Sequence, residues 1–288
     1  MKEPLYKLTL EGASLHLSKG NSKIGSGIWS FSTIPGNAEH IPTLKDGTPL
    51  TDVPGTCSKY CDGCARDGAC YAWRDLKLHH NVTVKAWGEN TLLLRSGRLW
   101  DELETFLTLK NGKAERFLKA AHESQMDPGE ALKTARKLAA VKTFRIHVSG
   151  ELEDAAQLRR WNLLALAHPE IQFGIYTKNF DALGEFLDSG TDFADNLVVN
   201  VSGWHGVEKP FLEKYSWAKL NVFVYDDSLR KGCGLPEAEK EELAAMHHCP
   251  AVGKDGHHAK LPDGTPVTCD HCGRCYRKTG MTTAVYAH

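Results

Sequence analysis

The sequence lacks several features that would place it in a class at once. Its 288 residues contain no run of about 18 apolar residues, so we expect no transmembrane helix and no membrane partner. The first ten residues lack the apolar core of a secretory signal, which favours a cytoplasmic location. An excess of charge of one sign is also missing, because the 35 Lys and Arg residues nearly balance the 36 Asp and Glu residues. The net charge of -1 excludes a generally basic nucleic-acid coat, and 41% hydrophobic residues predict a packed core.

Cysteine is absent from a long central stretch and concentrated on both sides of it. None occurs in the roughly 160 residues between Cys70 and Cys233, and Cys233 stands alone. Disulfide frameworks suit short secreted chains that lack a core, whereas this chain is long and leaderless. We therefore predict two compact metal–sulfur sites in a reducing compartment. Their ligand candidates are the N-terminal group Cys57, Cys61, Cys64 and Cys70 and the C-terminal group Cys249, Cys269, Cys272 and Cys275.

The C-terminal group favours an iron–sulfur cluster. Cys269, Cys272 and Cys275 follow a C-x2-C-x2-C pattern, and the remote Cys249 precedes a proline, which are the elements of bacterial [4Fe-4S] sites. Zinc is the alternative, although structural zinc usually takes two separated cysteine pairs. Five histidines could supply a zinc ligand: His247, His248, His257, His258 and His271.

The middle of the chain predicts a parallel sheet. Short β-branched and aromatic runs begin 23 to 28 residues apart, with helical segments between them, which is the spacing of successive βα units. An Asp-Pro-Gly-Glu sequence at Asp127 predicts the start of another helix, ending near Ala140. The expected strands are 143–149, 171–177, 197–202 and 220–225, after an N-terminal strand within 23–32; the expected helices are 154–167, 180–188, 210–217 and 236–247.

The N-terminal group resembles the cluster motif of radical S-adenosylmethionine (SAM) enzymes. Cys57, Cys61 and Cys64 have the C-x3-C-x2-C spacing of that family, in which three thiolates leave one iron open and SAM chelates it. Two residues depart from the pattern. Gly63 stands where an aromatic residue usually precedes the third cysteine, and Cys70 could act as a fourth ligand that closes the site.

The same resemblance implies a SAM site at the strand ends. The strand that begins at Thr143 ends in Ser149-Gly150-Glu151, where radical SAM enzymes often carry Gly-Gly-Glu. Carboxyl ends of strands are where α/β folds place their ligands. On the same strand, Arg145 and His147 either face the barrel mouth and bind an anion or lie on a half-exposed face. The implied SAM-binding residues are Ser149, Gly150, Glu151, Lys178 and Ser202.

A closer resemblance is to the phage-borne gene product eighty-eight family, a group of uncertain function that looks like a distant radical SAM branch. The segments that carry it are 27–32, 56–72, 145–151 and 176–178, in that order along most of the chain. The resemblance implies a phage, prophage or mobile-element setting and supplies no reaction.

Together these features predict an α/β protein with a partial or complete radical SAM-like (β/α) barrel. Residues 1–235 would form this domain with its Cys-rich loop, and residues 236–288 a C-terminal cluster-binding extension. The first functional hypothesis is an enzyme with two [4Fe-4S] clusters and SAM, served by an electron donor; its catalytic residues are not identified. The alternatives are a non-catalytic iron–sulfur protein for electron transfer or redox sensing, and a nucleic-acid-binding protein with structural clusters and a basic helical region.

Overall fold

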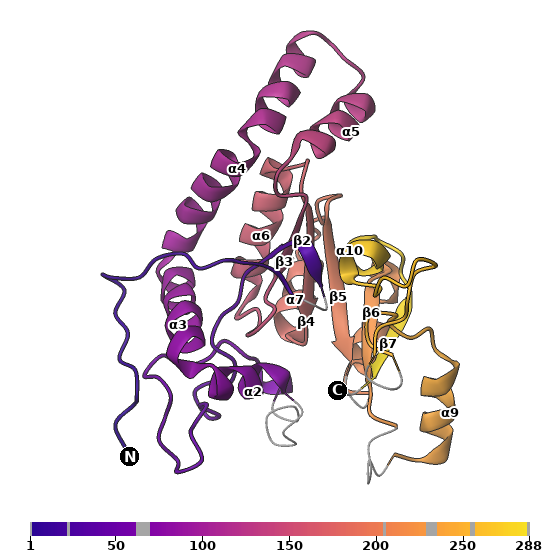
Figure 1. The fold of residues 1–288 in the computed structure, drawn as a ribbon. Coiled ribbons are helices and arrows are strands. Elements are labelled where there is room, and N and C mark those ends of the chain that lie inside the picture. Colours follow the sequence, from indigo (N-terminus) through magenta and orange to yellow (C-terminus); the bar gives the residue numbers. More distant parts are fainter. Residues whose placement is uncertain are drawn as a thin grey trace.

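Seven strands form one sheet in their order along the chain, in a computed structural model that describes residues 2–21, 24–61, 70–203, 206–228, 235–253 and 257–286 (Figure 1). The first strand pairs antiparallel with the second, and every later neighbour is parallel. The sequence prediction of an α/β fold with a parallel sheet is therefore confirmed. The strands are β1 (Ser18–Asn21), β2 (Gly25–Ser30), β3 (Thr143–Ile146), β4 (Gln172–Thr177), β5 (Leu197–Gly203), β6 (Asn221–Asp226) and β7 (Thr282–Tyr286).

Helices connect the parallel strands, and most begin where the sequence predicts. Asp154 caps the helix after β3, and Asn179 caps the one after β4, each accepting a backbone N–H three residues on. The α-helices are α2 (Tyr71–Leu78), α3 (His80–Ser96), α4 (Arg98–Glu123), α5 (Pro128–Leu138), α6 (Ala155–Ala167), α7 (Phe180–Asp188), α8 (Lys209–Lys214), α9 (Glu237–Ala245) and α10 (Cys269–Cys272). Short 3-10 turns are η1 (Lys59–Cys61), η2 (Ser216–Ala218) and η3 (Arg274–Tyr276).

The two faces of the sheet have different chemistry. Phe144 on β3 and Phe173 on β4 are fully buried against α4, α6 and α7, and they belong to the main hydrophobic core. Alternation along a strand sends the next residue to the other face, where Arg145 pairs in register with Gly174. A Cβ on Gly174 would lie 2.6 Å from the Tyr276 ring, so the C-terminal segment packs directly on this face. One face thus carries the core and the other faces the cysteine-bearing segment.

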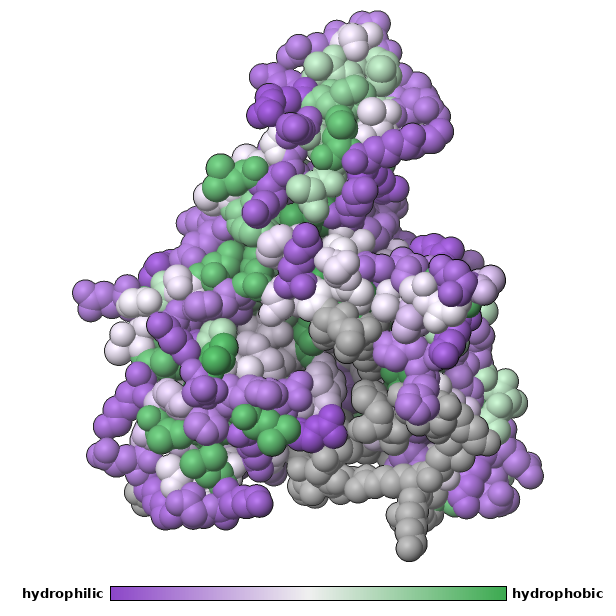
Figure 2. All heavy atoms as spheres, viewed as in Figure 1, coloured by the Kyte–Doolittle hydropathy of each residue, from purple (hydrophilic) through white to green (hydrophobic). Residues whose placement is uncertain are grey.

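Helices α4 and α5 form a hairpin that projects beyond the sheet (Figure 1). Small and aromatic residues, including Ala114 and Ala135, fill the seam between the two helices. Figure 2 shows apolar residues gathered on this hairpin with hydrophilic residues on its outer sides. Asp127 accepts the backbone N–H of Glu130 at 3.0 Å, which confirms the predicted helix start. The helix ends at Leu138, two residues before the predicted end.

Two further predicted elements differ clearly from the structure in extent. The strand expected over 143–149 ends at Ile146, because His147 has a left-handed φ of 52° that breaks the extended ladder. The helix expected over 210–217 is interrupted at Tyr215, and a 3-10 turn follows it. Closure of the sheet into a complete barrel is not seen among the described strands, since β1 and β7 lie at opposite edges.

The C-terminal residues contribute to the same sheet. β7 pairs with β6 over five residues at one edge of the sheet. α10 contacts β2, toward the opposite edge. Asp270 on α10 accepts the backbone N–H of Gly27 at 2.8 Å, and Tyr276 is buried with Ile24 and Ile28. Protein contacts therefore help to position this cysteine segment. No helix in the described parts of the chain is long and apolar enough to cross a membrane.

Candidate functional site

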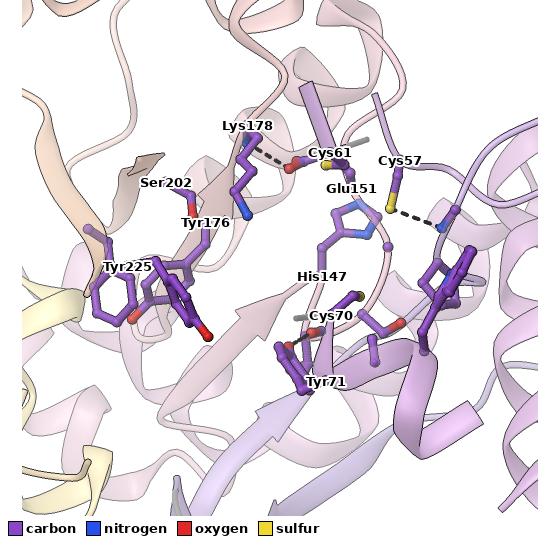
Figure 3. A pocket seen from close by; sticks show the side chains of 18 of the residues that line it. Cys57, Cys61, Cys70, Tyr71, His147, Glu151, Tyr176, Lys178, Ser202 and Tyr225 are labelled. Carbon is purple, nitrogen blue, oxygen red and sulfur yellow. Dashed lines mark hydrogen bonds between the residues drawn. The ribbon is translucent and has the colours of Figure 1, made fainter. Parts of the chain in front are cut away.

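Cysteines from both groups line a single cavity of about 220 Å³ near the carboxyl ends of the strands. Figure 3 shows Cys57, Cys61 and Cys70 of the N-terminal group at this cavity. The two groups are far apart in the sequence, so only the fold brings them together. Cys272 lies close enough to Cys275 to raise its pKa. Cys64, Gly63 and Cys233 lie outside the described residues. The cysteines that line the cavity are Cys57, Cys61, Cys70, Cys249, Cys269 and Cys275.

The N-terminal cysteine loop holds its thiols in a defined arrangement. The Cys57 Sγ accepts the backbone N–H of Gly36 at 3.2 Å, and the Cys57 N–H donates to the Gly36 carbonyl at 2.7 Å. The Cys57 thiol donates to Cys61, which lowers the pKa of Cys61 against the opposing effect of burial. The loop thus favours a thiolate at Cys61 without any ligand, and thiolate is the form that binds metal.

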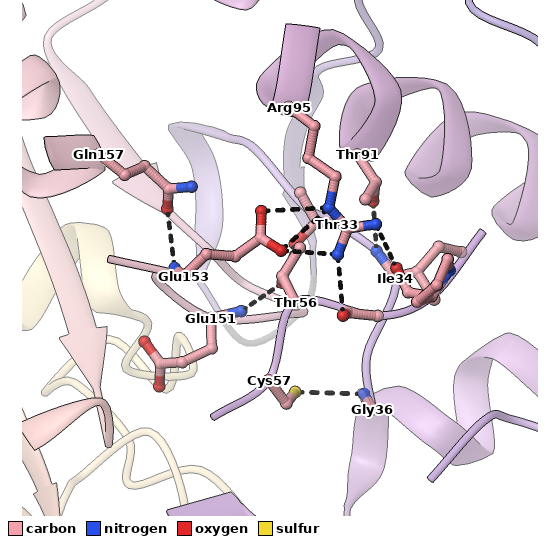
Figure 4. A network of polar contacts seen from close by, with 12 residues as sticks. Thr33, Ile34, Gly36, Thr56, Cys57, Thr91, Arg95, Glu151, Glu153 and Gln157 are labelled. Atoms are coloured by element: carbon pink, nitrogen blue, oxygen red, sulfur yellow. Dashed lines mark hydrogen bonds and ion pairs between the residues drawn. The ribbon is translucent and has the colours of Figure 1, made fainter. Parts of the chain in front are cut away.

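A polar network anchors this loop to α3 and to the end of β3 (Figure 4). Arg95 donates to the carbonyls of Pro54 at 2.9 Å and Gly55 at 3.1 Å, and it pairs with Glu153 at 2.6 Å. Each of these carbonyls lies within three residues of Cys57. The position of the cysteine loop therefore depends on a guanidinium group from a helix.

Changing Arg95 to alanine should lower the free energy of unfolding by about 1–3 kcal/mol, because a buried carbonyl loses its donor. Arg159→Ala is the matched control. Arg159 also pairs with a glutamate, Glu185, at 2.7 Å, but that pair is exposed and no backbone carbonyl is involved. Its loss should cost less than about 1 kcal/mol. Urea unfolding of both variants checks this, and equal losses would contradict the anchoring role of Arg95.

All five residues expected to bind SAM line the cavity. The Ser149 hydroxyl donates to the Thr33 carbonyl at 3.0 Å, so its proton is directed to the backbone. Lys178 extends its side chain beside the carboxylate of Glu151 in Figure 3. The fold therefore brings all five residues to one cavity. The five are Ser149, Gly150, Glu151, Lys178 and Ser202.

Glu151 connects the ends of two neighbouring strands. Its carboxylate accepts the backbone N–H of Leu152 at 2.8 Å and that of Lys178, after β4, at 2.7 Å. Its own N–H donates to the hydroxyl of Thr56 at 2.9 Å, which lies next to Cys57. Burial raises the pKa of Glu151, although these backbone donors oppose the rise. Glu151 therefore ties the cysteine loop, β3 and β4 into one rim.

His147 is a neutral, buried residue at the same rim. Its ring nitrogens lie 3.4 Å from the Thr33 hydroxyl and 3.3 Å from the Gln157 amide oxygen. Burial lowers the pKa of His147 from 6.5 to about 4. The ring is thus uncharged at neutral pH, so the anion-binding role considered for the Arg145–His147 pair falls to Arg145 alone.

The low pKa of His147 predicts a pH dependence of stability. Below pH 6.5, His147 binds a proton in the unfolded chain but stays unprotonated in the folded protein. The free energy of unfolding therefore falls as the pH drops toward 4. Between pH 7.5 and pH 5 the loss is about 2 kcal/mol. His147→Asn, a residue that tolerates positive φ, should lack this component. The free energy of unfolding of both proteins, measured across this pH range, checks the prediction. Contributions of other groups, such as Glu151, cancel in the difference between wild type and variant. Parallel pH profiles of the two proteins would contradict the prediction.

Arg145 places a positive charge at the cavity, near Cys269 and Cys275 of the C-terminal group. Its Cζ lies 4.7 Å from the centroid of the Tyr176 ring, and its buried Nε has no hydrogen-bond partner. Burial by itself would lower the pKa of Arg145. Electrostatic interactions with Tyr176, Tyr71 and other neighbours together have the larger effect, so the pKa of Arg145 is raised overall. The charge lowers the pKa of Cys275, although burial raises it overall. A permanent cation facing this cavity favours an anionic occupant.

The C-terminal cysteines are held by backbone contacts. The Cys275 carbonyl accepts from the Asn200 side chain at 3.1 Å, and the Cys249 N–H donates to the Ala284 carbonyl at 2.8 Å. None of the five histidines considered as zinc ligands is among the described residues that line the cavity. His248 instead contacts Asp226 at 2.8 Å, and His258 contacts the Val267 carbonyl at 2.8 Å. The donor set at the cavity is therefore dominated by sulfur.

Aromatic residues of the site were missed in the sequence, among them two on β6. Tyr225 and Phe223 on β6 both line the cavity, and Tyr176 contacts Phe223 edge-on with ring centroids 5.0 Å apart. Their i, i+2 spacing on a predicted strand places them on one face and was the available signal.

Comparison with known proteins gives a family and no function. No curated protein and no solved structure matches the chain. A sequence model of the family described as Gene product 88 matches residues 15–278, which is most of the chain and includes both cysteine groups. The chain therefore belongs to the Gene product 88 family.

Proposed function

We propose that this protein is a radical SAM-like iron–sulfur enzyme with two [4Fe-4S] clusters and a SAM site in the cavity. The observation that carries the proposal is the convergence of both cysteine groups with the five strand-end residues on one cavity. The order of the sheet supports it, since β2 to β7 are six parallel strands in sequence order, as in a partial barrel. Membership of the Gene product 88 family fits the phage setting that the resemblance implies.

The residues present fit iron–sulfur clusters. Thiolates are the ligands that iron–sulfur clusters use, and six cysteines face the cavity. Arg145 supplies a fixed positive charge beside ligands that are negative as thiolates. The first cluster would be held by Cys57, Cys61 and Cys64, and the second by Cys249, Cys269, Cys272 and Cys275.

The chain itself would bind and orient the substrate rather than carry out the electron chemistry. A bound cluster would supply an electron for the cleavage of SAM, delivered through the second cluster from an electron donor. Glu151 and Lys178 present opposite charges at the rim, which suits the amino and carboxylate groups of SAM. Tyr176, Phe223 and Tyr225 form an aromatic wall that excludes water.

A second candidate function rests on Cys70. This cysteine lines the same cavity and lies close enough to raise the pKa of Cys57. With Cys70 as a fourth ligand, both clusters would be saturated, and the protein would transfer electrons or sense redox state. Such a protein would bind iron in the same amount and would not bind SAM at iron.

The variant Cys70→Ser separates the two functions. We expect anaerobically prepared C70S to retain about eight irons per chain and to bind SAM with wild-type affinity, since three thiolates suffice for an open site. Loss of about half of the iron in C70S, together with no SAM binding by the wild type, would overturn the enzyme proposal in favour of saturated clusters.

A further inference from the structure

A second group of ligand-type side chains lies near the start of β4, at the opposite end of the strands from the cysteine cavity. His168 follows α6, Glu170 precedes β4, and Glu115 extends from α4. The His168 Nδ1 is 3.7 Å from the Glu115 Oε1 and 3.6 Å from the Glu170 Oε1. His168 is 2% and Glu170 1% exposed, so both are removed from water.

Three atoms of this group are buried and have no hydrogen-bond partner. They are the Glu115 Oε1, the His168 Nδ1 and the Glu170 Oε2. A buried polar atom without a partner costs about 1–3 kcal/mol, so three in one place call for a shared partner. One ligand atom from each residue lies within 4.8 Å of the other two.

Surrounding contacts direct the unpartnered atoms toward one another. The His168 Nε2 lies 3.1 Å from the Glu104 Oε2, so a neutral ring that carries its proton on Nε2 would present the Nδ1 lone pair to Glu115 and Glu170. Asn111 donates to the Glu170 Oε1 at 2.9 Å and leaves Oε2 without a donor. A carboxylate behind a histidine is the usual support of a metal-binding imidazole.

We propose that Glu115, His168 and Glu170 bind a divalent metal ion of the Mn²⁺ or Zn²⁺ class. Bonds of about 2.0–2.2 Å place neighbouring ligand atoms roughly 3.3–3.6 Å apart in a tetrahedral site. The two carboxylate oxygens lie at similar distances, 3.7 and 3.6 Å, from the His168 Nδ1. The mixed nitrogen and oxygen donors suit Mn²⁺ and Zn²⁺. Three carboxylates, those of Glu104, Glu115 and Glu170, surround the imidazole of His168, and none of the described Lys or Arg residues is paired with them, so a bound cation would offset their charge.

The ion would serve as a cross-link between α4 and the turn from α6 to β4. Glu115 lies in the half of α4 that continues into the projecting hairpin, whereas His168 and Glu170 belong to the sheet layer. The site shares no residue with the cysteine cavity and does not depend on the function proposed for it.

Mn²⁺ is the probe that distinguishes this site from the cysteines, because thiolates favour softer metals. Titration of Mn²⁺ into the purified protein, followed by EPR, should show one tightly bound ion per chain. Pulsed EPR should show coupling to one histidine nitrogen. Glu115→Gln should weaken binding at least 10-fold, and Glu104→Gln about 10–100-fold through the histidine. Glu123→Gln, an exposed residue on the same helix, is the control and should change binding less than about 2-fold.

Glu115→Gln is isosteric and partly exposed, so circular dichroism should show a folded variant. Equal Mn²⁺ affinity in E115Q and wild type would overturn the proposal. So would bound Mn²⁺ without nitrogen coupling, which would indicate surface carboxylates only. Absence of stoichiometric binding would also overturn it and would identify the group as an ion cluster around a protonated His168.

Discussion

Cys275→Ser should halve the iron content, from about eight to about four atoms per chain, and leave the response to SAM intact. Cys275 belongs to the C-terminal group, where its pKa is affected by Cys249 and Cys272. Its loss removes a ligand of the second cluster and leaves the N-terminal loop unchanged. Cys61→Ser should halve the iron as well, but it should abolish the SAM response.

Iron and sulfide analysis of these variants also tests whether the cavity holds one shared cluster or two. Because both cysteine groups line the same cavity, a single shared cluster would lose all its iron in either variant. Two clusters would lose half in each single variant and nearly all in the double variant. Cys233→Ser, which belongs to neither group, is the control and should keep its iron. Full iron in C275S would contradict the assignment of the C-terminal ligands.

Gly150→Ala should lower the free energy of unfolding by about 2–5 kcal/mol. Gly150 has a φ of 77°, which costs an L-residue about 1–2 kcal/mol. A Cβ there would also collide with the hydroxyls of Thr33 and Thr56, which are bonded to each other at 2.8 Å. Overpacking of this kind costs about 1–3 kcal/mol. Because Thr56 precedes Cys57, the displaced loop should also hold less iron.

Gly190→Ala separates the two causes. Gly190 has nearly the same φ, 70°, but no atom lies within 4 Å of its added Cβ. Its substitution should therefore cost only the backbone penalty of about 1–2 kcal/mol and should leave the iron content unchanged. Urea unfolding of both variants and iron analysis check this. Equal losses of stability would show that contact with Thr33 and Thr56 has no effect.

The fold was largely predictable because its signals are local. The βα spacing, the caps at Asp127 and Asp154, and the apolar runs at the strands each act within a few residues. The early end of β3 was not predictable, because His147 adopts positive φ only where Thr33 and Gln157 hold its ring.

The candidate site was predicted as a set of residues and not as an arrangement. Spacing identified both cysteine groups, but it carried no information on whether they face one cavity. That convergence depends on long-range contacts such as that of Asp270 with Gly27. The group of Glu115, His168 and Glu170 gave no signal at all, because α4 and the turn before β4 meet only in the folded chain.

The central claim, an open iron site for SAM in the cavity, is tested most directly by EPR of the anaerobically reduced protein with and without SAM. We expect about eight irons per chain and a spectrum in which the signal of one cluster changes when SAM is added. The same iron content with identical spectra would contradict it, because both clusters would then be saturated. Zinc in place of iron would contradict every redox function proposed for the cavity.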